Sequence, residues 1–216
     1  GFGLRSVYTL GSSPATQGLS EYPIYTAPGK GLYQNNPCSK QGAGDTGYLQ
    51  DAANATMDDG LTGGAGWKNN TGNILPMLGV FNGAFYISNS TKKPTWANTV
   101  ASGTAFATDY NTGSSDGIGF VNDNPTQEYV VKAAAATAVS IMVPDLTYNM
   151  ANLGTSFQDG QSTVKLATGA SAAAGAGQYA FQIVRVANDP LNSDNSAINS
   201  NVIVRFAPGS IMSVKY

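Results

Sequence analysis

The spacing of apolar runs constrains the fold of this chain more than any other feature of its sequence. The longest run spans residues 74–87 and is interrupted by Gly79 and Gly83. Glycine inside a strand-like run predicts a β-bulge or a close approach of another backbone. Turn-like residues at 88–94 then lead into 95–98, which we expect to return as the second strand of a hairpin.

Strand-like runs recur in the second half of the chain. We expect strands at 117–121 and 127–133, on either side of a turn at 122–125. Two further strands, at 178–186 and 201–206, alternate apolar and polar residues as half-buried strands do. Together with the first half, this pattern predicts an all-β fold, either a β-barrel or a β-sandwich, with long Gly/Asn-rich loops.

Helical patterns are weak, and at most one or two short helices are expected. The best candidate lies within 136–143, where Pro144 limits its length. The stretch 145–177 shows little regularity and ends in a tract of alanine and glycine. We therefore expect 145–177 to be an irregular insertion in the β domain.

Two parts are expected in the domain organisation: an extended N-terminal arm at 1–28 and a single β domain at 29–216. Glycine, serine and proline punctuate the arm, and Pro23 permits only a short edge strand there. Such an arm lies either on its own domain or on a neighbouring molecule. The candidate contact residues are its apolar and aromatic side chains, namely Phe2, Leu4, Val7, Tyr8, Leu10 and Tyr22.

Titratable groups are scarce in this chain. Only 11% of its 216 residues are charged, against roughly 25% in an average soluble domain, and none is histidine. Without histidine, Ser-His-Asp triads, Cys-His pairs and His-ligated metal sites are excluded. Cys38 is the single cysteine, so no intrachain disulfide forms, and we expect it to be a small half-buried residue.

The charge pattern and hydropathy also bear on partners. The net charge is −2 and no basic run is present, which argues against binding duplex nucleic acid. No apolar window approaches 18 residues, so no transmembrane helix is predicted. Residues 1–6 have neither the basic start nor the apolar run of a signal peptide. We therefore expect neither a nucleic-acid nor a membrane partner.

Carboxylates are the remaining groups for catalysis or metal binding. A glycosidase requires a carboxylate pair, and the candidates are Asp58, Asp59, Asp109, Asp116, Asp123 and Glu128. Most of them stand in or near turn-like sequence, which favours local turn or surface contacts. The loop 189–195 spaces oxygen atoms as a Ca²⁺ site does, but it lacks the glycine and the distal glutamate of an EF-hand. We expect no catalytic residue, no metal site and no cofactor.

Five stretches of the chain resemble a known family in their order and spacing. They are 18–24, 78–86, 91–98, 118–125 and the closing pair 182–186 with 201–206. Together they resemble small structural proteins of tailed-phage heads, particularly those of marine phages. Members of this group are regarded as capsid decoration, or cement, proteins. The closing residues 207–216 match nothing in that family.

The resemblance implies a β-barrel-like domain on the outer surface of an icosahedral capsid, commonly a trimer at a threefold or quasi-threefold site. Its implied partners are the major capsid protein and copies of itself, and its implied location is the outer surface of the virion. A neutral, small-residue surface suits this role, because burying it desolvates few charges. We therefore expect a non-enzymatic protein that stabilises the capsid shell, with the arm as its main contact element.

Other classes of function stay open. One alternative is a major coat protein of the jelly-roll type. Another is a carbohydrate-binding fibre or surface module. A carbohydrate binder needs solvent-facing Trp or Tyr side chains, whereas Trp67 and Trp96 are both expected to pack in the core or in the hairpin. A carboxylate hydrolase, most plausibly a glycosidase, is the third alternative.

Overall fold

The computed structural model describes residues 2–9, 13–14, 18–29, 31–40, 47–51, 77–134, 147–151, 160–172, 181–187 and 200–207. This part of the chain is all-β and contains no helix. Its strands form two large antiparallel sheets and one small sheet. The predicted all-β class is therefore confirmed. The sheets are sandwich-like and do not close into a barrel.

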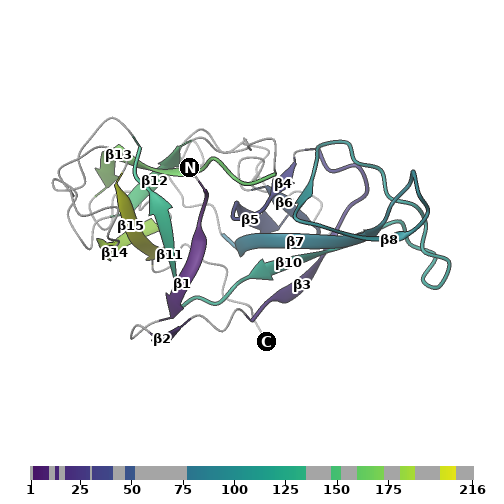
Figure 1. Ribbon diagram of the computed structural model, residues 1–216, viewed down its shortest axis with the longest axis horizontal. Helices are drawn as coiled ribbons and strands as arrows, with labels where there is room; N and C mark the ends of the chain where they lie inside the picture. Colours follow the sequence, from purple (N-terminus) through teal and green to yellow (C-terminus); the bar gives the residue numbers. More distant parts are fainter. Residues whose placement is uncertain are drawn as a thin grey trace.

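The first large sheet has seven strands, and every pairing in it is antiparallel. Figure 1 shows it on the left of the molecule. Its strands, in sheet order, are β13 (Lys165–Ala172), β12 (Thr147–Ala151), β14 (Phe181–Val186), β15 (Asn201–Phe206), β11 (Gln127–Lys132), β1 (Arg5–Thr9) and β2 (Ser13–Pro14).

The second large sheet has six strands and lies on the right in Figure 1. Its strands, in sheet order, are β3 (Ser20–Ile24), β10 (Gly117–Asn122), β7 (Gly79–Ile87), β5 (Pro37–Lys40) and β6 (Leu49–Asp51), while β8 (Pro94–Ala97) pairs with the far end of β7. The small sheet consists of β4 (Leu32–Tyr33) and β9 (Thr99–Val100).

Each large sheet covers a buried apolar cluster on one face. The first cluster includes Tyr129, Phe181 and Val204 of the seven-stranded sheet, together with Val80 from β7. The second cluster includes Phe81 of β7 with residues from β3, β5, β6 and the small sheet. Burying one large apolar side chain contributes about 1.5–3 kcal/mol, so these two clusters hold the sheets together. Val80 and Phe81 are consecutive residues that enter different clusters.

Several predicted strands are confirmed. The hairpin exists, since β8 pairs antiparallel with β7 and Trp96 lies opposite Phe85. The two closing strands are β14 and β15, which pair with each other. The helix candidate at 136–143 lies outside the described residues.

The stretch 145–177, expected to be irregular, contains β12 and β13 at the edge of the seven-stranded sheet. The sequence conceals these strands because β13 consists largely of small residues and shows no sustained alternation. Pairing with partner strands defines them instead, since Met150 of β12 lies opposite Leu166 of β13 and both side chains are buried. Met150 and Leu166 thereby extend the first cluster to the edge of the sheet.

Residues 1–28, expected to form an extended arm, contribute strands to both large sheets. β1 lies between β11 and β2, and β3 forms the edge of the six-stranded sheet against β10. Leu4, just before β1, is completely buried in the first cluster. The physical reason is that β11 and β10 offer unpaired backbone groups along their sides, which the N-terminal segment satisfies. Pro23 stands in an edge strand, as predicted.

Candidate functional site

A β-bulge in β7 shapes the surface where the two large sheets meet. Phe120 of β10 pairs with Gly83, but its neighbour Val121 pairs with Phe81, so Asn82 is the extra residue. Gly83 has a φ of 153°, and a Cβ atom there would lie 2.7 Å from the indole of Trp96. The bulge predicted around Gly83 is therefore confirmed. It turns the Asn82 side chain out of the regular alternation of β7.

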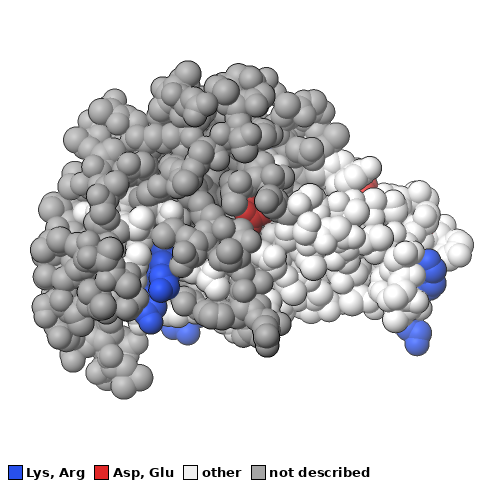
Figure 2. Space-filling model, turned by 90° about the horizontal axis from the view of Figure 1, so that it is seen from above, with Lys and Arg blue, Asp and Glu red and all other residues white. Residues whose placement is uncertain are grey.

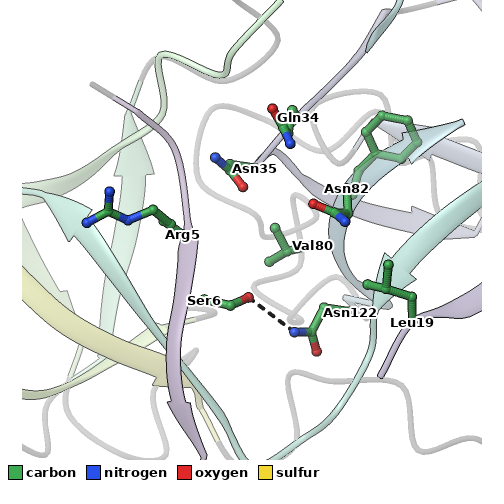
Figure 3. A pocket seen from close by; sticks show the side chains of 9 residues that line it. Arg5, Ser6, Leu19, Gln34, Asn35, Val80, Asn82 and Asn122 are labelled. Carbon is green, nitrogen blue, oxygen red and sulfur yellow. Dashed lines mark hydrogen bonds between the residues drawn. The ribbon is translucent and has the colours of Figure 1, made fainter. Parts of the chain in front are cut away.

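A cavity of about 240 Å³ lies beside this bulge, where β1 passes the start of β7 (Figure 3). Its polar lining comes from four separate parts of the chain: Ser6 of β1, Gln34 and Asn35 of the turn after β4, Asn82 of β7 and Asn122 of β10. Leu19 and Val80 supply apolar wall. Four of the nine lining residues thus carry carboxamides, and one carries a hydroxyl.

Two of the amides are held in place by other groups. Asn122 is buried, and its Nδ2 donates to Ser6 Oγ at 3.1 Å and to Gln127 Oε1 at 3.2 Å. Asn35 has a φ of 65°, a left-handed conformation that asparagine tolerates. Its Nδ2 donates to the carbonyl oxygen of Phe2 at 3.2 Å. These contacts fix both side chains at the wall of the cavity.

Gln34 and Asn82 supply the other two amides of the cavity. Gln34 and Asn82 make no side-chain hydrogen bond within the described part of the chain. The backbone of Gln34 is nevertheless anchored, because its N–H donates to Gly160 O at 3.2 Å and its carbonyl accepts from Ser162 N–H at 3.0 Å. Each free amide can both donate and accept. The cavity therefore presents unused hydrogen-bonding capacity on a positioned backbone.

No charged group points into the cavity from the residues that line it. Arg5 contributes to the wall, but its guanidinium points away (Figure 3), and its Cζ lies 5.3 Å from the centre of the Phe2 ring. The wider surface is similar: on the face in Figure 2, the described Lys and Arg side chains gather at two separate places, and Asp and Glu show only small areas. The cavity is a polar but uncharged site.

An exposed apolar row crosses the six-stranded sheet. Four residues lie opposite one another on adjacent strands, in the order Pro23, Ile118, Phe85 and Trp96. Directly opposed residues share one face of a sheet. Pro23 is exposed, and the exposed fractions of Ile118, Phe85 and Trp96 are 39%, 40% and 50%. We call these four residues the apolar row.

Trp96 is less covered than a core or hairpin packing residue would be. Its ring packs against Phe120 with centroids 4.9 Å apart, and its indole N–H donates to Asn98 Oδ1 at 3.3 Å. Half of the side chain still faces solvent. The other tryptophan, Trp67, lies outside the described residues. Trp96 therefore combines a fixed orientation with an accessible ring.

The candidate contact residues of the N-terminal segment do not gather on one surface. Leu4 lies in the first cluster, while Phe2 and Val7 pack against a small cluster on the other face of the seven-stranded sheet. Tyr8 is 37% exposed, and Tyr22 is partly buried against the second cluster. Leu10 lies outside the described residues. Of the described candidates, Tyr8 offers the largest accessible aromatic surface.

Tyr22 also contacts one of the candidate carboxylates. Its hydroxyl donates to Asp123 Oδ2 at 2.7 Å. Burial first, and then this hydrogen bond, raise the pKa of Tyr22 well above its ordinary value. Asp116 is similar, because it accepts a hydrogen bond from the Tyr48 hydroxyl at 2.8 Å, which raises the pKa of that tyrosine. Both carboxylates therefore anchor tyrosines on neighbouring elements.

The remaining carboxylates have comparable local contacts. Asp109 Oδ1 accepts from the backbone N–H of Asn111 at 2.8 Å, as in a turn, and buried Glu128 pairs with Arg185 at 3.0 Å. Asp58, Asp59 and the loop 189–195 lie outside the described residues. Within the described ranges, no group of three Cys, Asp or Glu side chains is arranged to hold a metal ion.

Cys38 is more deeply placed than the sequence predicted. It is completely buried, and its thiol lies 3.4 Å from the carbonyl oxygen of Gly79. Burial, followed by the nearby Asp51 carboxylate, raises the pKa of the thiol. Cys38 is therefore a protonated core residue at neutral pH.

The polar cavity residues were not singled out in the sequence. Asn82 and Asn122 do fall within stretches of strand-like sequence, and an asparagine beside glycine inside an apolar run marks Asn82 as unusual. Gln34 and Asn35 carry no comparable mark, because only the packing of β1 against β7 brings them to the cavity.

Compared with known proteins, the chain matches no protein-family model, no curated protein and no solved structure. Across the described ranges, no helix has the length and apolar character needed to cross a membrane. Function is therefore inferred from the residues and the geometry given above.

Proposed function

We propose that the chain is a non-enzymatic structural protein of a phage virion, which binds the outside of the capsid shell and stabilises it. The observation that carries the proposal is the apolar row of Pro23, Ile118, Phe85 and Trp96. A contiguous set of exposed apolar side chains on a rigid sheet is typical of a protein-contact surface. The resemblance to decoration proteins supplies the partner, the major capsid protein.

The chemistry of the row suits a permanent contact with a shell. None of its four residues carries a charge, so burial requires no desolvation of an ion. Two of the four are aromatic, and aromatic anchors carry much of the binding energy of protein interfaces. The row extends over four hydrogen-bonded strands. Its geometry therefore changes little on binding, which reduces the entropic cost of the contact.

Self-association belongs to the same proposal. Decoration proteins of the kind that this chain resembles are commonly trimers, and a stable contact buries about 800 Å² on each partner. Light scattering on the purified chain at several concentrations tests this state. A discrete trimer, or a monomer that saturates heads, supports decoration, whereas growth to shell-sized particles would identify a coat protein instead.

Co-sedimentation with heads emptied of DNA, from the virus that encodes the chain, tests the shell contact. The variants Phe85→Ser and Ile118→Ser each remove one exposed member of the row. We expect each to weaken binding about tenfold, the usual consequence of losing about 1.4 kcal/mol at an interface. Tyr110→Ser is the matched control, because Tyr110 is wholly exposed and lies outside the row.

Thermal unfolding of each variant distinguishes loss of contact from loss of fold. Row variants that remain folded and still saturate the heads with wild-type affinity would refute the row as the contact surface. If the wild-type chain does not bind the heads at all, the decoration function itself is refuted.

A further inference from the structure

We propose that the cavity between β1 and β7 binds one neutral saccharide unit, a function separate from the shell contact and independent of it. The cavity is lined by Ser6, Gln34, Asn35, Asn82 and Asn122 (Figure 3). The inference rests on the chemistry of this lining, on its unused hydrogen-bonding groups and on its size.

The chemistry of the lining favours a polyhydroxylated ligand. A sugar hydroxyl both donates and accepts hydrogen bonds, and a carboxamide offers two N–H donors beside one acceptor oxygen. Four carboxamides and a hydroxyl therefore match a ring of hydroxyls without any charge. Leu19 and Val80 add an apolar surface on which the C–H groups of a sugar ring can rest.

Two of the amides are available for a ligand. The Gln34 and Asn82 side chains make no hydrogen bond elsewhere in the described part of the chain, whereas Asn122 and Asn35 are oriented by Ser6 and by the Phe2 carbonyl. The site thus combines two oriented groups with two unoccupied ones. The bulge contributes Asn82 to the site, because Asn82 is the extra residue that a regular β7 strand would lack.

Size and charge narrow the class of ligand. A volume of about 240 Å³ is below the roughly 300–1,000 Å³ of pockets that enclose drug-sized ligands, so one sugar ring is a better match than an oligosaccharide. The guanidinium of Arg5 points away from the cavity, and no carboxylate is among its lining residues. A phosphate, uronic acid or amino sugar would therefore lose hydration without gaining an opposite charge.

β10 carries an aromatic side chain on the same face as the cavity residue Asn122. Phe120 precedes Asn122 by two residues on β10, so both side chains lie on the same face, about 7 Å apart along the strand. Phe120 is partly exposed and packs against Trp96. An aromatic surface therefore lies along β10 next to Asn122, outside the residues that line the cavity.

Saturation-transfer NMR on the full chain tests the proposal with glucose, galactose, mannose and N-acetylglucosamine, each at about 10 mM, tenfold above a Kd of about 1 mM. Glucuronate and glucosamine serve as charged analogues. We expect transfer to at least one neutral sugar, and weaker transfer to its charged analogue. The absence of transfer to all four neutral sugars would overturn the proposal.

Variants then locate the site. Asn82→Ala and Gln34→Ala each remove one unbonded amide, and each should weaken sugar binding about three- to tenfold, as expected for one neutral hydrogen bond. Asn89→Ala is the matched control, because Asn89 is an exposed amide in the turn before β8. Unchanged thermal midpoints confirm that the variants fold. Equal sugar affinity in wild type and in both cavity variants would overturn the site, as would an equal loss in Asn89→Ala.

The same variants distinguish sugar binding in the cavity from binding of the apolar row to the shell. Asn82→Ala should retain full co-sedimentation with heads, and Phe85→Ser should retain sugar binding, since Phe85 does not line the cavity. Loss of sugar binding with intact shell binding, or the reverse, assigns each failure to its own site.

Discussion

The side-chain amide of Asn122 donates a hydrogen bond to the hydroxyl of Ser6 at 3.1 Å. The two residues are 116 positions apart, and they belong to different sheets: Ser6 to β1 and Asn122 to β10. The bond closes one side of the polar cavity and links the N-terminal strand to the centre of the chain. The bond also attaches β1, the first strand of the N-terminal segment, to the rest of the folded domain.

The first prediction concerns Leu4. Leu4→Ala should lower the free energy of unfolding by about 2–5 kcal/mol, because it removes a completely buried side chain from the first cluster. Denaturant unfolding followed by circular dichroism measures this change. Tyr8→Ala, in the strand β1 that follows Leu4, should cost less because Tyr8 is 37% exposed. A Leu4 variant as stable as wild type would mean that the N-terminal segment is an independent arm after all.

The second prediction concerns Gly79. A Cβ atom there would collide with the backbone carbonyl oxygen of Asn122 and lie 2.8 Å from the Val121 side chain. Because backbone has to move, Gly79→Ala should destabilise the fold by about 1–3 kcal/mol. Gly18→Ala is the matched control, since open space surrounds that position, and its stability should stay within about 0.5 kcal/mol of wild type. Equal stability of the two variants, measured in urea, would contradict the close approach.

The third prediction concerns stability at alkaline pH. Burial and the hydrogen bond to Asp123 raise the pKa of Tyr22 above its ordinary 10.0, so the folded chain holds this proton more tightly than the unfolded chain. The resulting stabilisation is complete below pH 10 and is lost as the pH rises through 10 towards the raised pKa of the folded state.

Thermal midpoints between about pH 8 and pH 11 test this dependence. The midpoint of the wild type should fall more steeply with pH than that of Tyr22→Phe, which has no proton to lose at this position. A residual slope is expected in the variant, because burial also raises the pKa of Tyr129. Identical slopes for the two proteins would contradict the assigned role of the Tyr22 hydroxyl.

Local patterns made much of the fold predictable. The hairpin of β7 and β8 and the closing pair β14 and β15 follow from alternation bounded by turn residues, which act over a few positions. Gly79 and Gly83 interrupt an apolar run, and this local pattern indicated the close approach at Gly79 and the bulge beside Gly83. By contrast, β12 and β13 escaped prediction, because strands of small residues are defined by their partners rather than by their own sequence.

Taken by itself, the sequence determined the all-β class and excluded histidine-dependent chemistry, because strand alternation and the choice of side chains are local properties. Tertiary structure decided that Leu4 is buried and that Phe85 and Trp96 lie on one exposed face. It also brought Ser6, Asn82 and Asn122 together around one cavity. Strand register decides these placements, since a slip of one residue moves every side chain of a strand to the opposite face. Register in turn depends on pairing between distant segments, such as β1 with β11, which no local pattern specifies.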